Sequence, residues 1–211
     1  LSVAAQEFTR ADSLRGSITP QRAWWDVMRY DIEVQPDYDK QFTSGANQIT
    51  YKVVQEKHPD VMQIDLQEPL VIDRILFDDA TELQFKREGN VYWVNTLPQE
   101  LDSEHTVKIF FSGNPHVAVR PPWDGGWSFS KDAEGRPLMT VTCQGLGASI
   151  WYPNKDHQSD EPDRGASLTM RVPDALTAVA NGRLLDKTKH QDGTTSYKWG
   201  VENPISNYTI I

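Results

Sequence analysis

The chain has 211 residues, of which 38% are hydrophobic and 13 are glycine. A chain of this length can bury roughly 70% of its unfolded surface, and its composition is that of a globular protein, which excludes a disordered or fibrous chain. The formal net charge of −9 disfavours nucleic acid as a partner, because the phosphate backbone would be repelled. Apolar runs are only a few residues long, whereas a bilayer helix needs about 20, so no membrane span is expected.

The chain contains one cysteine, Cys143, which excludes an intrachain disulfide and a cysteine-rich zinc site. Its alternation with Val141 predicts a small buried apolar residue. The first six residues, Leu1–Gln6, resemble the small-residue end of a cleaved secretory signal. They predict a secreted or periplasmic protein, although an arbitrary chain boundary would leave the same residues.

Residues 1–20 predict an extended arm on the surface, because Phe8, Leu14 and Ile18 are scattered without a period. Residues 21–211 predict one β-sandwich domain, in which apolar and polar residues alternate with a period of two. This alternation is found at residues 28–35, 49–53, 62–66, 107–111, 141–143, 168–172 and 197–201. Each predicted strand has one polar side, so the sequence predicts an all-β fold of mostly antiparallel strands. One or two short helical turns are expected around Leu146–Tyr152, ended by Pro153.

Residues 116–163 concentrate glycine, proline and tryptophan, and loops of this kind on a β-sandwich often carry function. The run Asp156–Asp163 holds five potential metal ligands, but it lacks the spacing of a calcium loop and there is no H-E-x-x-H zinc motif. A solvated, hydrogen-bonded turn explains it better. The segment around Ser149 also breaks the G-x-S-x-G pattern of a serine hydrolase, and the predicted burial of Cys143 argues against a nucleophilic thiol.

The seven tryptophans leave a second class of function open. Two of them, Trp93 and Trp199, lie in strand patterns and are expected in the core. The other five lie in or beside loops, where exposed indoles could stack on sugar rings; they are Trp24, Trp25, Trp123, Trp127 and Trp151. A carbohydrate-binding module that uses these loop tryptophans therefore stands as an alternative.

Several motifs occur in an order that points to a known family. The longest is Gln144–Asp156, followed by Glu161–Asp163, in which a strand ends in Gln, a short turn follows, and then aromatic-Pro-x-x-Asp. The others are Tyr30–Val34, Gly45–Ile49, Val179–Gly182 and Pro204–Tyr208. Together they resemble the amino-terminal domain of the aminopeptidase-N-like zinc metallopeptidases, the gluzincin aminopeptidases. The resemblance covers residues 22–211.

This resemblance implies a saddle-shaped antiparallel β-sandwich with one or two short helical turns. In the family, a catalytic domain follows. It supplies G-x-M-E-N, and it supplies H-E-x-x-H followed by a distant Glu, which hold zinc and activate water. Neither motif occurs here, so the resemblance implies a catalytic domain beyond residue 211, with zinc bound there and neither a metal ligand nor a catalytic residue in this chain. The implied partners are that catalytic domain and a peptide substrate, and the whole protein would be a hydrolase.

By the same resemblance, Gln144 matches the position from which a Gln or Glu contacts the free α-amino group of the substrate. An amide oxygen accepts hydrogen bonds from an ammonium, which suits that role. Gly145 belongs to the same predicted substrate-binding loop, where the family commonly has a bulkier residue. The alternative is that Gln144 simply ends a strand and bonds to neighbouring backbone. Tyr152, Pro153 and Asp156 match positions expected to shape the loop.

Overall fold

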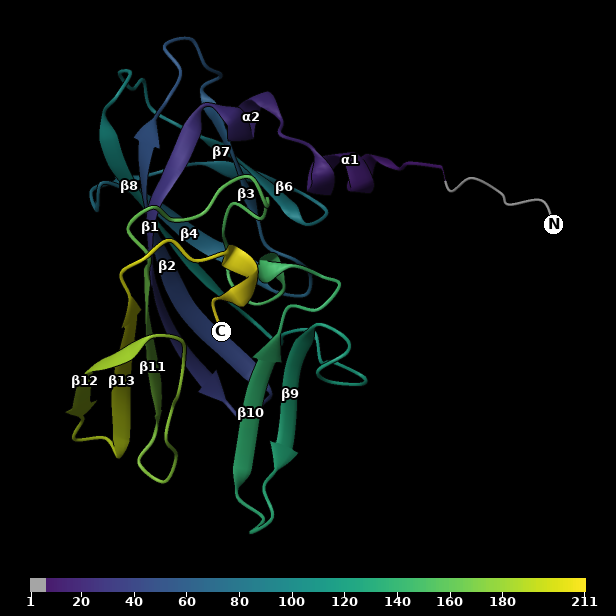
Figure 1. Ribbon diagram of the computed structural model, residues 1–211, viewed down its shortest axis with the longest axis vertical. Coiled ribbons are helices and arrows are strands. Elements are labelled where there is room, and N and C mark those ends of the chain that lie inside the picture. Colours follow the sequence, from purple (N-terminus) through teal and green to yellow (C-terminus); the bar gives the residue numbers. More distant parts are fainter. Residues whose placement is uncertain (1–6) are drawn as a thin grey trace, which may run out of the picture.

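The computed structural model describes residues 7–211, and its largest element is an eight-stranded sheet (Figure 1). The strands follow one another across it in the order β12 (Arg183–Lys189), β13 (Thr194–Val201), β11 (Ala166–Pro173), β1 (Trp25–Asp37), β2 (Phe42–Val53), β8 (Glu104–Gly113), β4 (Val71–Phe77) and β5 (Thr81–Glu82). All neighbours are antiparallel except β1 and β11, which run parallel with Tyr30 beside Ala166.

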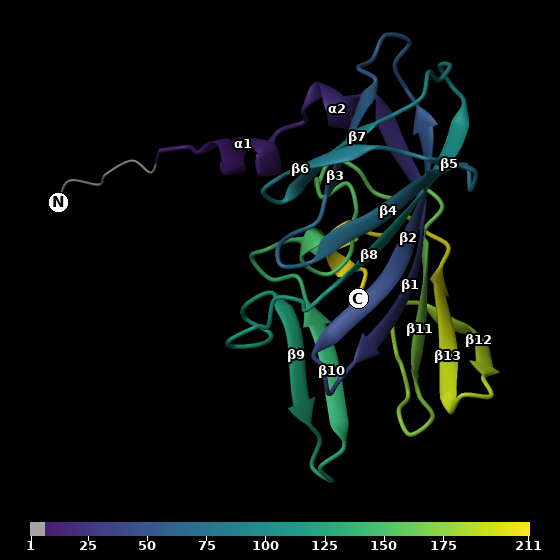
Figure 2. The same cartoon turned by 180° about the vertical axis from the view of Figure 1, so that it is seen from behind.

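Two smaller sheets complete the fold, one toward each end of the large sheet (Figures 1 and 2). The first has three strands in the order β3 (Val61–Asp65), β7 (Val91–Asn95) and β6 (Phe85–Glu88). The second is the hairpin of β9 (Gly126–Lys131) and β10 (Pro137–Thr142). One core cluster includes Ile32 of the large sheet, Val94 of the three-stranded sheet and Trp127 of the hairpin. The predicted all-β sandwich fold is confirmed.

The alternation of apolar and polar residues that predicted the strands corresponds to an alternation of buried and exposed side chains in the structure. Along β1 the side chains of Tyr30, Ile32 and Val34 are buried, whereas Glu33 between them is exposed. Successive side chains of a strand point to opposite faces of the sheet, so one face of β1 packs against the smaller sheets. Full burial of each such apolar side chain contributes roughly 1.5–3 kcal/mol.

The predicted extended arm is wrong over α1 (Arg10–Gly16), which is helical. Thr9 caps this helix: its hydroxyl accepts from the Asp12 amide at 3.2 Å, and the Asp12 carboxylate accepts from the Thr9 amide at 2.8 Å. This reciprocal pair satisfies two amides that a helix start leaves without partners. Leu14 on the same helix is buried, so the segment has an apolar anchor.

Three other short helices lie outside the strands. They are α2 (Pro20–Ala23), η1 (Ala148–Ile150) and η2 (Asn207–Thr209). Of these, η1 lies within the predicted helical turn, which is confirmed. Residues 1–6, on which the expectation of a secretory signal depends, lie outside the described residues. Within residues 7–211, no helix has the length and apolar character needed to cross a membrane.

Candidate functional site

A tight turn follows β10 and presents the predicted residues to solvent. The carbonyl oxygen of Cys143 accepts hydrogen bonds from the amides of Leu146 at 3.1 Å and Gly147 at 2.9 Å. Between these anchors, Gln144 and Gly145 form the tip of the turn, and both are exposed. The turn therefore holds the Gln144 side chain at the surface, where a ligand can reach it.

The Asp156 carboxylate fixes the second half of this loop. It accepts hydrogen bonds from the Ser149 amide at 3.0 Å, the Ser149 hydroxyl at 2.6 Å and the Ala148 amide at 3.3 Å. Gly147 has φ 87° and ψ 176°, a conformation essentially restricted to glycine, and a Cβ there would lie 2.5 Å from the Asp156 carboxylate. As predicted, Asp156 shapes the loop.

A buried carboxylate joins this loop to the three-stranded sheet. Asp65 at the end of β3 accepts from the Asp156 amide at 2.9 Å, and its own backbone pairs with Asn154. The same carboxylate accepts from the Arg22 guanidinium at 2.7 Å. Tyr152 is fully buried, and its hydroxyl donates to the Asn207 carbonyl oxygen at 3.3 Å. These contacts hold the loop on a rigid part of the fold.

Lys155 is a second buried charge behind the loop. Its ammonium pairs with Asp160, donates to the Trp25 carbonyl oxygen at 2.5 Å and lies 4.6 Å from the Trp25 ring centroid. Burial lowers the pKa of Lys155, and the neighbouring Asp160 carboxylate opposes that shift. With both side chains buried, this pair is part of the support of the loop.

A groove of about 820 Å³ lies beside the tip of the loop. Its walls come from three parts of the chain: the segment around α1, the loop of residues 144–161, and η2. Within it, the Tyr208 hydroxyl donates to Gln144 Oε1 at 2.6 Å. An amide oxygen has two lone pairs, so this bond orients the Gln144 side chain and leaves one acceptor position free.

Carboxylates outnumber cationic side chains along this groove. The acidic residues are Asp12, Asp156, Asp160 and Glu161, of which Asp160 is paired with Lys155, and the basic ones are Arg15 and His157. A cleft lined mainly by one sign of charge raises the local concentration of the opposite sign. The groove therefore favours a cation such as an ammonium.

The side chains of residues 7–211 do not form a site that fits a zinc ion. In the part of the chain that the structure describes, no three His, Cys, Asp or Glu residues form a group that could hold a metal. Zinc sites in proteins use three or four side-chain ligands. Burial raises the pKa of the Cys143 thiol to about 12, which also disfavours the thiolate that a metal or an electrophile would need.

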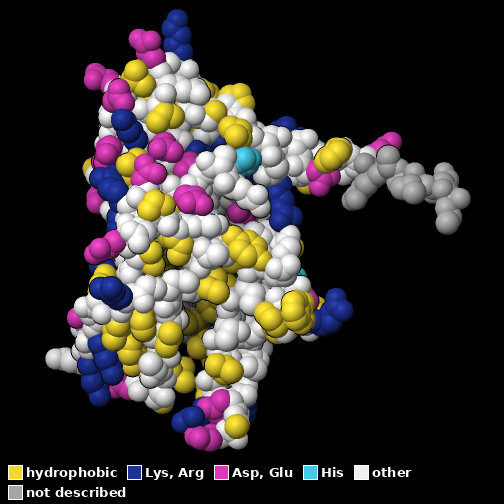
Figure 3. All heavy atoms as spheres, viewed as in Figure 1, with side chains coloured by type: hydrophobic (Ala, Val, Ile, Leu, Met, Phe, Trp, Pro, Cys, Tyr) yellow, Lys and Arg dark blue, Asp and Glu magenta, His cyan; other side chains and the backbone are white. Residues whose placement is uncertain are grey.

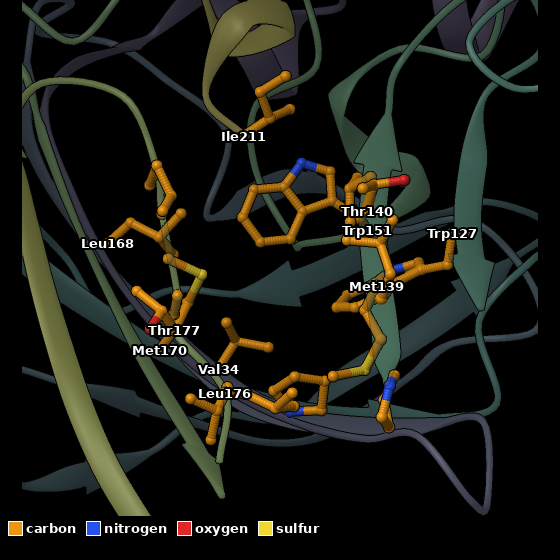
Figure 4. Close-up of a pocket in the computed structure, with 18 of the residues that line it drawn as sticks. Val34, Trp127, Met139, Thr140, Trp151, Leu168, Met170, Leu176, Thr177 and Ile211 are labelled. Atoms are coloured by element: carbon orange, nitrogen blue, oxygen red, sulfur yellow. The ribbon is translucent and has the colours of Figure 1, made fainter. Parts of the chain in front are cut away.

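A second hollow, of about 540 Å³, is apolar (Figure 4). It lies between β10 and β11, where Met139 and Trp151 face Leu168 and Met170 across the gap, and Ile211 lies at its rim. On the surface in Figure 3, hydrophobic side chains gather over the lower half of the molecule, where this hollow opens. It contains neither Gln144 nor Gly145, but two of the loop tryptophans, Trp127 and Trp151, line it.

The tryptophans do not form the exposed row that a sugar-binding face would need. Four of the five loop tryptophans are buried: Trp24, Trp25, Trp127 and Trp151. Only Trp123 among the five is exposed, at 80% of its surface. Trp93 and Trp199, predicted as core residues, are half-buried and donate their indole N–H groups to Glu88 and to the Ala178 carbonyl oxygen. The carbohydrate-binding alternative is not supported.

Comparison with solved structures finds the same architecture elsewhere. The structure of a mutant M1 zinc metallopeptidase from Deinococcus radiodurans matches with a TM-score of 0.68 and 18% sequence identity over 89% of this chain. Native yeast LTA4 hydrolase matches with a TM-score of 0.67 and 17% identity, again over 89% of this chain. The chain has the fold of the M1 metallopeptidase amino-terminal region. It spans 41% of the Deinococcus protein and 28% of the yeast protein.

The M1 amino-terminal fold agrees with the resemblance read from the sequence motifs. No family model matches the chain, and no curated protein does either. One of the similar structures is a mutant Deinococcus M1 metallopeptidase bound to a Tyr-Ser-Ala substrate. It matches with a TM-score of 0.67 and 18% identity, and the match covers 89% of this chain and 41% of that protein. At these identities the likeness establishes the fold alone.

The M1 amino-terminal fold brings together residues that the motifs did not connect. Gln144 and Gly145 lie in the turn after β10, which ends at Thr142, whereas the motif predicted a strand that ends at Gln144 itself. The sequence reasoning missed Tyr208 as a partner of Gln144, and it missed Arg15, whose guanidinium donates to the Gly145 carbonyl oxygen at 2.8 Å. No local signal could have found either contact, because 64 and 130 residues separate the partners.

Proposed function

We propose that this chain is the non-catalytic amino-terminal domain of a zinc-dependent aminopeptidase. Its role is to bind the free amino terminus of a peptide, so that the first residue is removed by a zinc domain outside this chain. The zinc ligands and the residues that cleave the peptide bond would all belong to that domain. The proposal also assigns peptide substrate and the catalytic domain as partners, and it keeps a secreted or periplasmic location as an expectation.

One observation carries the proposal: Gln144 is exposed at a mainly acidic groove, with Oε1 oriented by Tyr208. A peptide amino terminus is an ammonium with three N–H donors, and it needs acceptors and a negative field. The free lone pair of Gln144 and the acidic lining supply both. The fold that the chain shares with M1 metallopeptidases supports the same assignment.

The test is a kinetic comparison in the longest protein encoded together with this chain, which is first examined for H-E-x-x-H. Gln144→Ala removes one hydrogen bond to a charged group, worth about 1.5–3 kcal/mol, so kcat/KM for peptide substrates falls roughly 10- to 150-fold. Gln144→Glu keeps the acceptor and retains activity. Gln84, exposed and not part of the groove, is the control: Gln84→Ala leaves kcat/KM unchanged.

Two results would overturn the proposal. One is a longer protein that lacks a zinc motif and aminopeptidase activity. The other is a Gln144→Ala variant with the kcat/KM of the parent, because an amide that binds the substrate's amino group cannot be removed without loss.

A further inference from the structure

The N-terminal segment, residues 8–17, is attached to the domain through buried polar groups. The Arg22 guanidinium donates to three carbonyl oxygens of this segment, those of Leu14 at 2.9 Å, Arg15 at 3.1 Å and Ser17 at 2.8 Å. Gln63 Nε2 donates to the Leu14 carbonyl oxygen at 3.0 Å. Since Arg22 and Gln63 are buried, these bonds are shielded from competing water. The segment is therefore held in one place on the domain.

From this position the segment contacts the tip of the substrate loop. Arg15 Nη2 donates to the Gly145 carbonyl oxygen at 2.8 Å, in the peptide group that joins Gly145 to Leu146, directly after Gln144. Gly145 has φ 72°, and no heavy atom lies within 4 Å of the place where its Cβ would stand. Glycine has wide conformational freedom, and side-chain packing does not restrain it here. The Arg15 bond is thus a direct restraint on the backbone beside Gln144.

A second connection runs through the interior. The Asp65 carboxylate accepts from Arg22, which holds the segment, and from the Asp156 amide. The Asp156 side chain in turn accepts from Ala148 and Ser149 in the loop. Segment and loop therefore share one buried carboxylate, and their positions depend on each other.

We propose that the face of the N-terminal segment that lines the groove, formed by Phe8, Asp12, Arg15 and Gly16, is a functional wall of the substrate groove. Arg15 is a positioning residue, which holds the Gly145 carbonyl and through it the Gln144 side chain. This inference rests on the proposed function of Gln144 and extends it to a part of the chain outside the residues that resemble the aminopeptidase family. Arg15 acts through the loop and does not itself contact the substrate.

Kinetics of the longer protein separate positioning from chemistry. Gln144 would bind the ammonium equally before and during the reaction, so Arg15→Ala raises KM about 3- to 10-fold and leaves kcat within about twofold. Arg15→Lys, which retains one donor, stays near the parent. Arg10→Ala is the matched control, since Arg10 lies on the same helix, pairs with Glu88 and is not part of the groove. In a Gln144→Ala background, Arg15→Ala adds nothing, because both changes remove the same interaction.

Hydrogen exchange on the full 211-residue chain gives a readout that needs no activity. In Arg15→Ala, the amides of Leu146 and Gly147 exchange faster than in the parent, whereas in Arg10→Ala they do not. Two results would overturn this inference and leave the proposed function intact. One is equal exchange of these amides in the parent, Arg15→Ala and Arg10→Ala. The other is an unchanged KM in Arg15→Ala when Gln144→Ala does lose activity. Loss of the Gln144→Ala effect itself would instead overturn the proposed function.

Discussion

Replacing Arg22 by Met tests the buried connection between the N-terminal segment and the sheet. The Arg22 guanidinium is almost fully buried and pairs with the buried carboxylate of Asp65 at 2.7 Å. Arg22→Met keeps the apolar stem but leaves the carboxylate without its partner cation, along with three carbonyl oxygens. Removing one member of a buried pair costs about 3–5 kcal/mol. In a domain of this size the unfolding midpoint therefore falls by about 6–20 °C.

The assay is urea and thermal unfolding followed by tryptophan fluorescence, with the slope m compared between variants. Arg10→Met is the control, because its ion pair with Glu88 is exposed and its loss leaves the midpoint unchanged. Arg22→Met/Asp65→Asn is expected to be more stable than Arg22→Met, since no uncompensated charge remains. If Arg22→Met loses less than about 1 kcal/mol at unchanged m, the pair does not hold the segment and the reasoning is refuted.

Two further predictions concern the loop and the core. Gly147→Ala is expected to lower the free energy of unfolding by about 1–3 kcal/mol more than Gly145→Ala does. At Gly147 the backbone conformation is restricted to glycine and a Cβ would collide with Asp156, whereas at Gly145 there is open space for a Cβ. Equal urea midpoints of the two variants would contradict this. Burial raises the pKa of Cys143 from about 9 to about 12. Between pH 9 and 12 the unfolded chain has lost the thiol proton and the folded chain still holds it, so the free energy of unfolding declines as the pH rises through this range. Below pH 9 the thiol is protonated in both states and the contribution of Cys143 to stability is complete. Cys143→Ala therefore shows a shallower loss of urea midpoint from pH 8 to 10.5 than the parent, and parallel curves would contradict the assignment.

Most strands that could be predicted from the sequence have one exposed and one buried face, although β3, predicted at residues 62–66, is buried on both faces. The alternation in β1, β2, β8, β11 and β13 is visible because each packs one side into the core. In contrast, β12 was missed, because all seven of its residues are exposed and no alternation marks it. The sequence predicts a loop where the hairpin strand β9 lies, because this strand begins in the glycine-rich run before Trp127.

At the site, the residues on one continuous stretch were predictable and the contacts across the chain were not. Gln144, Gly145 and Asp156 belong to a single motif. Arg15 and Tyr208 meet that motif only after α1 and η2 pack beside it. The helix that carries Arg15 did have a local signal, because Thr9 and Asp12 stand three residues apart as in a capping box. The apolar residues of the segment show no helical period, so the capping pair is the only local sign of this helix.

The parallel pairing of β1 with β11 sets an order for synthesis. Tyr30 lies beside Ala166, so the centre of the large sheet cannot close until that distant residue has left the ribosome. Until then β1 has β2 on one side and an open backbone edge on the other. Pairings between residues so far apart in the chain form slowly, and open edges invite aggregation. During translation the incomplete sheet is thus expected to aggregate unless chaperones bind it. Chains truncated before β11 should accordingly be recovered as inclusion bodies.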